Sequence, residues 1–263
     1  PIMLAYDIFV AGILAGSVEI VAQSKSKTYR IETTARSHGF LDFLIEFRGQ
    51  NEVHGRFLHG QAQPIEYKTK GIWAGEVRSV AIRYGVDGSV RYEARPSSAE
   101  DEREEVPQKQ LPGTTDPFSA LYQAILHRPK GATCDSRLAV FDGRRRFDIL
   151  LEDLVGGAVA GPLYTGPARL CRARRKMIAG ASRRTWLPQF ARPTGIDIWL
   201  APVQAGLPDL PVRMHADLGI ADLVVDLVSI GGRKFPPGKT PPGTTPEKGS
   251  SAGGNHVDSQ TQQ

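Results

Sequence analysis

Apolar and polar residues alternate along much of this chain. Val18, Ile20 and Ala22 are separated by single residues, and a similar alternation recurs over 28–33, 79–84 and 90–95. A period of two residues places successive side chains on opposite faces of a β-strand. The pattern therefore predicts a mainly β protein whose strands have one buried and one exposed face.

Two Asp-Gly pairs lie between predicted strands and indicate hairpins. Asp87-Gly88 lies between 79–84 and 90–95, and Asp142-Gly143 lies between 138–141 and 144–150. Asp-Gly favours tight turns because glycine readily adopts a positive φ. Two hairpins of this kind predict an antiparallel, meander-like sheet.

One amphipathic helix is expected after Asp116, a natural N-cap that is followed by proline at the first helical position. Its apolar stripe is Phe118, Leu121, Tyr122, Ile125 and Leu126. This spacing predicts a helix that packs on or inside the sheet. The segment 39–47 fits either a short helix or a buried strand, and we favour the helix.

The chain divides into one domain and a tail. Its 263 residues can bury one substantial core, and we assign residues 1–232 to a single curved β domain. From residue 233 onward, proline, glycine, serine and glutamine predominate without apolar periodicity. Such a composition cannot offset its ordering entropy, which predicts a disordered tail over 233–263. No stretch reaches the length of a transmembrane helix.

The charge distribution suggests an anionic partner. The net charge is +5, and arginines are concentrated between residues 128 and 192. Four of them are candidates for binding phosphate or carboxylate groups: Arg144, Arg146, Arg172 and Arg174. Exposed arginines that protect sheet edges are the more common alternative. Nucleic acid is not expected, because aromatic residues do not alternate with these charges.

The sequence offers no catalytic or cofactor-binding constellation. Gly238-Lys239-Thr240 is similar to the end of a phosphate-binding loop, but Arg233 occupies the position of its first glycine. His54 and His59 have no carboxylate at ligand spacing. We therefore expect no enzyme activity, no cofactor and no metal site.

The chain has two cysteines, Cys134 and Cys171. They can form one intramolecular disulfide, which would stabilise the fold by about 4 kcal/mol in the loop-entropy model. Two unrelated buried thiols are the alternative, and the residues alone do not decide between them.

The order of several short motifs resembles that of the exported bacterial proteins of domain of unknown function family 3108. The motifs are Tyr6–Gly16, Thr34–Phe40, Asp116–Leu121, Val140–Phe147, Ile198–Pro202 and Leu210–Arg213. The resemblance covers roughly residues 5 to 228. It implies a periplasmic protein of a Gram-negative bacterium, built as an open or spiral half-barrel around a helix. An oxidising compartment favours the Cys134–Cys171 disulfide.

Two functions follow from this resemblance as expectations. The first is a non-enzymatic periplasmic protein whose curved sheet binds a lipid or another amphipathic envelope ligand. The alternative is a scaffolding protein that binds peptidoglycan or an envelope protein and has a filled interior. Because the chain begins at Pro1, we expect that an export signal has been removed.

Overall fold

The computed structural model describes residues 1–39, 42, 46–128, 131–182 and 195–234. They form one antiparallel sheet of thirteen strands that is not closed into a barrel. The strands are β1 (Ile2–Val10), β2 (Ile13–Lys25), β3 (Thr28–Ser37), β4 (Phe47–Leu58), β5 (Gln61–Trp73), β6 (Glu76–Tyr84), β7 (Val90–Arg95), β8 (Ser136–Phe141), β9 (Arg146–Ala160), β10 (Thr165–Ala179), β11 (Ile196–Ala201), β12 (Leu210–Asp217) and β13 (Asp222–Ile230). The helical segments are η1 (Gln108–Gln110), α2 (Pro117–Leu121) and η2 (Tyr122–Leu126).

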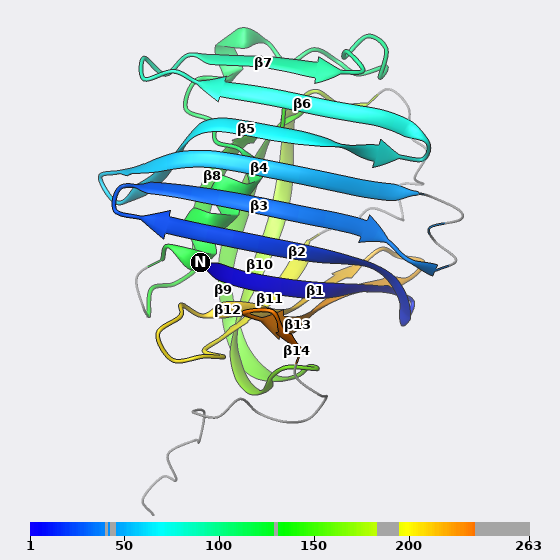
Figure 1. Cartoon of the computed structure of the whole chain (residues 1–263), viewed down its shortest axis with the longest axis vertical. Coiled ribbons are helices and arrows are strands. Elements are labelled where there is room, and N and C mark those ends of the chain that lie inside the picture. The colour runs from blue at the N-terminus through cyan, green and yellow to red at the C-terminus, as the bar shows by residue number, and fades with distance from the viewer. Residues whose placement is uncertain (40–41, 43–45, 129–130, 183–194, 235–263) are drawn as a thin grey trace, which may run out of the picture.

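Two meanders lie side by side in this sheet. Strands β1 to β7 pair in sequence order, β8 to β13 pair in sequence order, and β13 pairs with β1 at the junction. Strands β7 and β8 are therefore the two edges. The connection between them carries α2 and η2, which lie behind the β1–β7 layer in Figure 1. The predicted mainly β fold, an open curved sheet with short helical segments, is confirmed.

The turns explain how such long strands stay in register. The predicted Asp87-Gly88 and Asp142-Gly143 turns connect β6 to β7 and β8 to β9. Other strand pairs are joined by two-residue turns in which both residues have positive φ, as at His59-Gly60 and Ala74-Gly75. Turns of this type match the right-handed twist of the flanking strands.

The helix begins as predicted and then changes its pitch. Asp116 Oδ1 accepts hydrogen bonds from the backbone N–H groups of Phe118 and Ser119, both at 2.9 Å. The second half, η2, is a π-helix, whose i→i+5 hydrogen bonds add one residue to the turn. Leu121, the last residue of α2, is 39% exposed although the predicted apolar stripe includes it.

Helical side chains and aromatic rings fill the concave side of the sheet. The rings of Tyr122 and Tyr29 stack with their centroids 5.3 Å apart, and those of Phe57 and His127 stack at 4.3 Å. Leu126 packs against three of the buried hydrophobic clusters. Burying each large side chain contributes about 1.5–3 kcal/mol. The helix is thus the centre of the core.

The two ends of the sheet meet along a contact that we call the seam, formed by Val80 of β6 and Gly143 of the β8–β9 turn. A Cβ atom added to Gly143 would lie 2.1 Å from Val80 Cγ1. Nearby, Thr115 forms a parallel bridge with Val140 of β8. The seam brings together segments that are far apart in the sequence.

The structure bears on two predicted segments, the tail from residue 233 and the segment 39–47. Arg233 and Lys234, the first residues of the predicted tail, instead form a short strand, β14 (Arg233–Lys234), which pairs with β13. The rest of the tail, 235–263, and most of the segment 39–47 lie outside the described residues. Within the described part of the chain, the helices are too short and too polar to cross a membrane.

Replacing Gly143 with alanine should destabilise the protein by about 2 kcal/mol or more, because the strain of a positive φ adds to a clash with Val80. Gly88→Ala is a matched control, since Gly88 also has a positive φ but nothing lies within 4 Å of an added Cβ. Urea unfolding measures both losses. Equal losses would show that the seam is not tightly packed.

Candidate functional site

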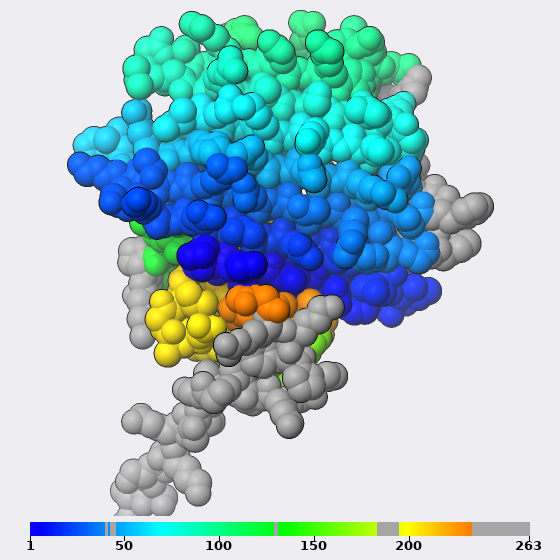
Figure 2. Space-filling view, viewed as in Figure 1, coloured from blue at the N-terminus to red at the C-terminus, as the bar shows by residue number. Residues whose placement is uncertain are grey.

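An open groove of about 560 Å³ crosses the sheet from β3 to β7. The side chains that line it alternate along the strands with Ile31, Val53, Tyr67 and Ile82, which belong to the buried cluster around the helix. The groove therefore lies on the outer face of the half-barrel, the surface of β1–β7 that Figure 2 presents to the viewer.

Small residues of β6 form the floor of the groove. Ser79 is paired with Lys70 of β5 on one side and with Arg95 of β7 on the other. Ala81 is flanked in the same way by Lys68 and Glu93. Adjacent strands are about 4.8 Å apart, so the two walls stand roughly 10 Å apart at the backbone.

The lining side chains form two cross-strand rows that differ in charge. The acidic row is Glu32, Glu52, Lys68, Ala81 and Glu93. The basic row is Thr34, Gln50, Lys70, Ser79 and Arg95. Residues on the same face of a strand recur about every 7 Å. The groove can therefore bind a ligand whose positive and negative groups are about 7 Å apart.

Ion pairs compensate the acidic row better than the basic row. Glu52 accepts a hydrogen bond of 2.8 Å from His54 and forms a 2.7 Å ion pair with Arg30. The hydrogen bond from His54, assisted by the Arg30 charge, lowers the pKa of Glu52. Within the described residues, the side chains of Lys70 and Arg95 have no such partner. These two cations are available to an anionic group.

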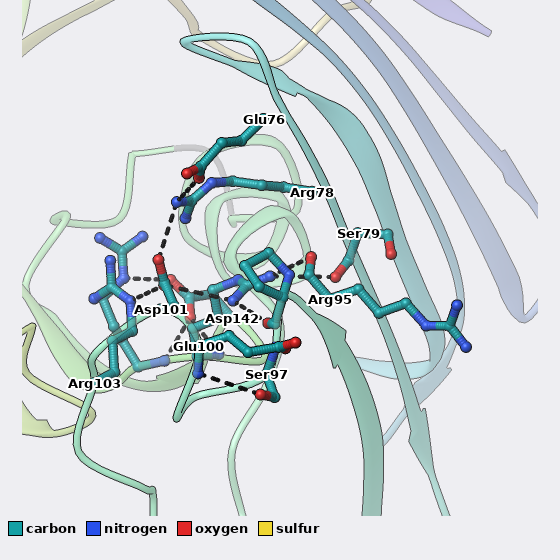
Figure 3. A network of polar contacts seen from close by, with 12 residues as sticks. Glu76, Arg78, Ser79, Arg95, Ser97, Glu100, Asp101, Arg103 and Asp142 are labelled. Carbon is teal, nitrogen blue, oxygen red and sulfur yellow. Dashed lines mark hydrogen bonds and ion pairs between the residues drawn. The ribbon is translucent and has the colours of Figure 1, made fainter.

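A polar network next to the groove holds the seam together (Figure 3). Asp101 forms ion pairs with Arg78, Arg103 and Arg144. Burial opposes ionisation of Asp101, but the hydrogen bonds and charges of Arg103 and Arg78 outweigh this effect and lower its pKa. One carboxylate thus ties β6 and the loop after β7 to the β8–β9 turn.

Arg144 is the central cation of this network. Its guanidinium donates hydrogen bonds to the backbone carbonyls of Arg95 and Pro96, at 2.6 and 2.7 Å. The side chain of Arg95 extends away from the network in Figure 3. The seam therefore fixes the backbone at the end of β7, whereas the Arg95 side chain lines the groove.

A family model for proteins of unknown function, DUF3108, matches residues 5–228. The chain belongs to the DUF3108 family. This membership confirms the resemblance seen in the sequence motifs. No curated protein matches the chain.

A solved structure shares the fold of this DUF3108 protein. A beta-barrel-like protein of domain of unknown function DUF1849 from Brucella abortus aligns with a TM-score of 0.50 at 14% identity, over 88% of this chain and 96% of that chain. A protein named "putative lipoprotein" from Parabacteroides distasonis aligns with a TM-score of 0.34 at 10% identity, over 87% and 94% of the two chains. At 14% identity, the likeness to the Brucella protein shows the fold alone.

The four arginines predicted to bind an anion do not form one uncompensated surface. Arg144 is mostly buried in the seam network. Arg146 forms a 2.7 Å ion pair with Asp148, whose carboxylate Arg137 also contacts at 2.6 Å. Both arginines of β9 and its turn are thus bound to carboxylates of the same DUF3108 chain.

The other two arginines lie together on β10, and each has its own acidic partner. Arg172 donates two hydrogen bonds to Asp197, at 2.6 and 2.8 Å. Arg174 forms a weaker 3.5 Å ion pair with Glu152. Each of the four arginines therefore has a carboxylate partner, and for Arg144, Arg172 and Arg174 this partner lies on another strand or loop. Anion binding at the four residues stays a prediction.

The structure contains the Cys134–Cys171 disulfide, which ties the segment before β8 to β10. Asp153 lies beside it and accepts hydrogen bonds from the Cys134 backbone N–H and from Arg169. These three ligand-type residues are therefore engaged in structural contacts. His54 contacts Glu52, as described above.

The groove has no continuous sequence motif, because its residues belong to five strands. The local signal is weak: two small outward residues, Ser79 and Ala81, in a strand between strands with long charged side chains. Only the strand register shows that these residues are aligned.

Asp116 is a fully buried carboxyl at the start of the helix. Its Oδ2 atom has no hydrogen-bond partner among the described residues. Burial raises its pKa to about 6, although hydrogen bonds from Ser119 and Phe118 act in the opposite direction. Burial also raises the pKa of the nearby Tyr29 and Tyr67 phenols. The interior around the helix therefore disfavours charge.

Because the folded-state pKa of Asp116 exceeds the unfolded value, the folded protein binds more protons than the unfolded chain between about pH 4 and pH 6. This residue should therefore cost stability as the pH rises through that window, up to about 3 kcal/mol. Asp116→Asn keeps a capping side chain without the charge.

Urea unfolding of both proteins across this pH range tests the expectation. The free energy of unfolding of Asp116→Asn, relative to the parent, should increase as the pH rises. Carboxylates such as Asp101 contribute equally to both proteins. A difference that does not change with pH would contradict the expected titration.

Proposed function

We propose that this DUF3108 protein is a non-enzymatic protein of the Gram-negative cell envelope that binds peptidoglycan in the groove on its outer face. The observation that carries the proposal is the position of the helix. α2 and η2 occupy the concave side of the sheet, whereas the polar groove over β3–β7 is open to the outside. A binding role is therefore assigned to the outer face.

The filled interior favours this reading over a lipid carrier. A carrier needs an apolar space for acyl chains. Here Tyr29, Tyr122 and Phe57 pack against one another inside the half-barrel. A lipid chain would have to displace the helix and break the Tyr29–Ser119 hydrogen bond of 2.7 Å.

The disulfide supports a location in the envelope. Disulfides persist in oxidising compartments such as the periplasm and are rare in the cytosol of most organisms. Cys134 and Cys171 are bonded to each other, and the described chain has no other cysteine. The bond is thus consistent with an exported protein.

The chemistry of the groove fits a cell-wall polymer. Glycan chains offer hydroxyl and amide groups, and their stem peptides offer carboxylate and ammonium groups. The basic row can hold carboxylates through Lys70 and Arg95 and can hydrogen-bond to the polymer through Thr34, Gln50 and Ser79. Glu93 of the acidic row can bind an ammonium group. An extended polymer can span several strands.

Ala81→Tyr should abolish binding to purified peptidoglycan sacculi, because a ring on the floor would fill the groove. Gln23→Tyr adds the same ring to an exposed position of β2 outside the groove and is the matched control. Cosedimentation measures binding, and we expect at least a tenfold loss for Ala81→Tyr alone. Thermal unfolding should be nearly unchanged for both variants, since both sites are on the surface.

Two results would contradict the proposal. One is that the parent does not cosediment with sacculi, and the other is that Ala81→Tyr binds as well as the parent. Sacculi incubated with the parent should release no soluble fragments. Release would identify an enzyme instead.

A further inference from the structure

One end of the half-barrel carries exposed apolar side chains on neighbouring turns and strand ends. They are Ile13, Leu14, Trp73, Val77 and Ile220, which we call the apolar rim. Val77, Ile220 and Ile13 are 75%, 69% and 66% exposed, values that are high for large apolar residues. Side chains this exposed contribute little to the core, so another role is needed to account for their grouping.

Backbone hydrogen bonds place these turns along the same end of the sheet. The Ala11 N–H donates to the Asp222 carbonyl at 3.0 Å and connects the β1–β2 turn to the start of β13. The Ala74 N–H donates to the Glu46 carbonyl at 2.9 Å and connects the β5–β6 turn to the start of β4. The β1–β2 and β5–β6 turns lie on the right in Figure 1.

The opposite end of the β1–β7 layer is more polar. Its β2–β3 turn contains Ser26 between Lys25 and Lys27, and its β4–β5 turn contains His59. Exposed apolar side chains also occur towards that end, at Met3, Leu58, Ile65 and Val86, but of these only Val86 is more than half exposed. The half-barrel is thus asymmetric along its strands.

Uncompensated cations lie directly behind the rim, on the outer face. Arg36 is aligned across the sheet with Arg48, near the end of β3. Lys70 and Arg95 follow in the next row, about 7 Å further from the rim. Arg36, Lys70 and Arg95 form what we call the basic belt, and their side chains have no partner among the described residues.

Three carboxylates near the rim are, in contrast, paired with bases. Glu46 pairs with Arg48, Glu76 pairs with Arg78, and Asp222 pairs with His215. These pairs reduce the repulsion that the carboxylates would otherwise exert on an anionic surface. At the β12–β13 turn, which carries Ile220, Asp217 accepts a hydrogen bond from the Gly219 N–H. The uncompensated cations therefore lie on the β3–β7 side of the rim.

We infer that the apolar rim and the basic belt form a docking surface for an anionic lipid membrane. Apolar side chains on turns can enter the boundary between headgroups and acyl chains, where tryptophan is a preferred residue. Cations a few ångströms behind them lie at the level of the phosphates. Each basic residue near such a surface contributes about 1 kcal/mol of attraction. Lys70 and Arg95 also line the groove, so lipid phosphates and a wall polymer would compete for these two cations.

Vesicle cosedimentation tests the inference with the full chain. The parent should bind vesicles of phosphatidylcholine mixed with phosphatidylglycerol, and only weakly bind phosphatidylcholine alone. The rim variant Ile13→Ser/Val77→Thr/Ile220→Ser should lose at least tenfold in partitioning. Val86→Ser, which removes an exposed apolar residue at the opposite end, is the matched control and should bind like the parent.

The belt gives an independent readout. Replacing Arg36, Lys70 and Arg95 with glutamine should remove the salt-dependent part of binding, because exposed charges are screened over about 8 Å at physiological ionic strength. Trp73 should shift its fluorescence to shorter wavelength when the parent binds, and Trp73→Phe should remove that shift.

The inference is overturned if the parent does not bind anionic vesicles or if the rim variant binds as well as the parent. A loss in Val86→Ser as large as that in the rim variant would overturn it too. The rim variant should still cosediment with sacculi, because its substitutions lie outside the groove. Membrane binding and wall binding can therefore fail separately.

Discussion

The packing of a short helix into the concave side of a long sheet is the interaction on which the rest of this structure depends. A strongly curved antiparallel sheet leaves an apolar inner surface that must be covered. The helix supplies Tyr122, Ile125 and Leu126 to that surface, and Leu126 packs against three hydrophobic clusters. This contact covers the apolar inner surface of both meanders.

The cost of this arrangement is a buried carboxyl. The helix must start inside the protein, where its first N–H groups are shielded from water and need an acceptor. Asp116 supplies the acceptor but loses hydration, which raises its pKa. The seam network solves the related problem of holding the two sheet edges together. There a single carboxylate, Asp101, is shared by three arginines.

Because the helix fills the interior, the candidate binding surfaces lie on the outside of the half-barrel. The groove on the outer face, the apolar rim and the basic belt all belong to the same layer, β1–β7, together with the adjoining β12–β13 turn. Arg95 links these features, because its carbonyl is held in the seam while its side chain lines the groove. The proposed wall-binding and membrane-binding surfaces therefore share Lys70 and Arg95.

Local structure could be predicted well from the residue pattern. Alternation predicted strands at 79–84 and 90–95, the Asp-Gly pairs predicted their hairpins, and Asp116-Pro117 predicted the start of the helix. Local patterns succeed here because strand faces, turns and caps depend on residues only a few positions apart. The turn at Ala74-Gly75 was not predicted, because only its glycine marks it. The π-helical form of Tyr122–Leu126 was also missed, because the prediction assumed an α-helical period.

Which charged side chains remain available to a ligand depends on the folded chain. Arg172 is compensated by Asp197 and Arg144 by Asp101, carboxylates that lie on other strands or loops. Lys70 and Arg95 were not predicted as site residues. Their side chains have no ion-pair or hydrogen-bond partner among the described residues, and they flank Ser79. The pairing of β1 with β13 likewise joins the two ends of the domain. Electrostatic compensation and strand register are long-range properties, so they are set by the folded neighbours of a residue rather than by its neighbours in the chain.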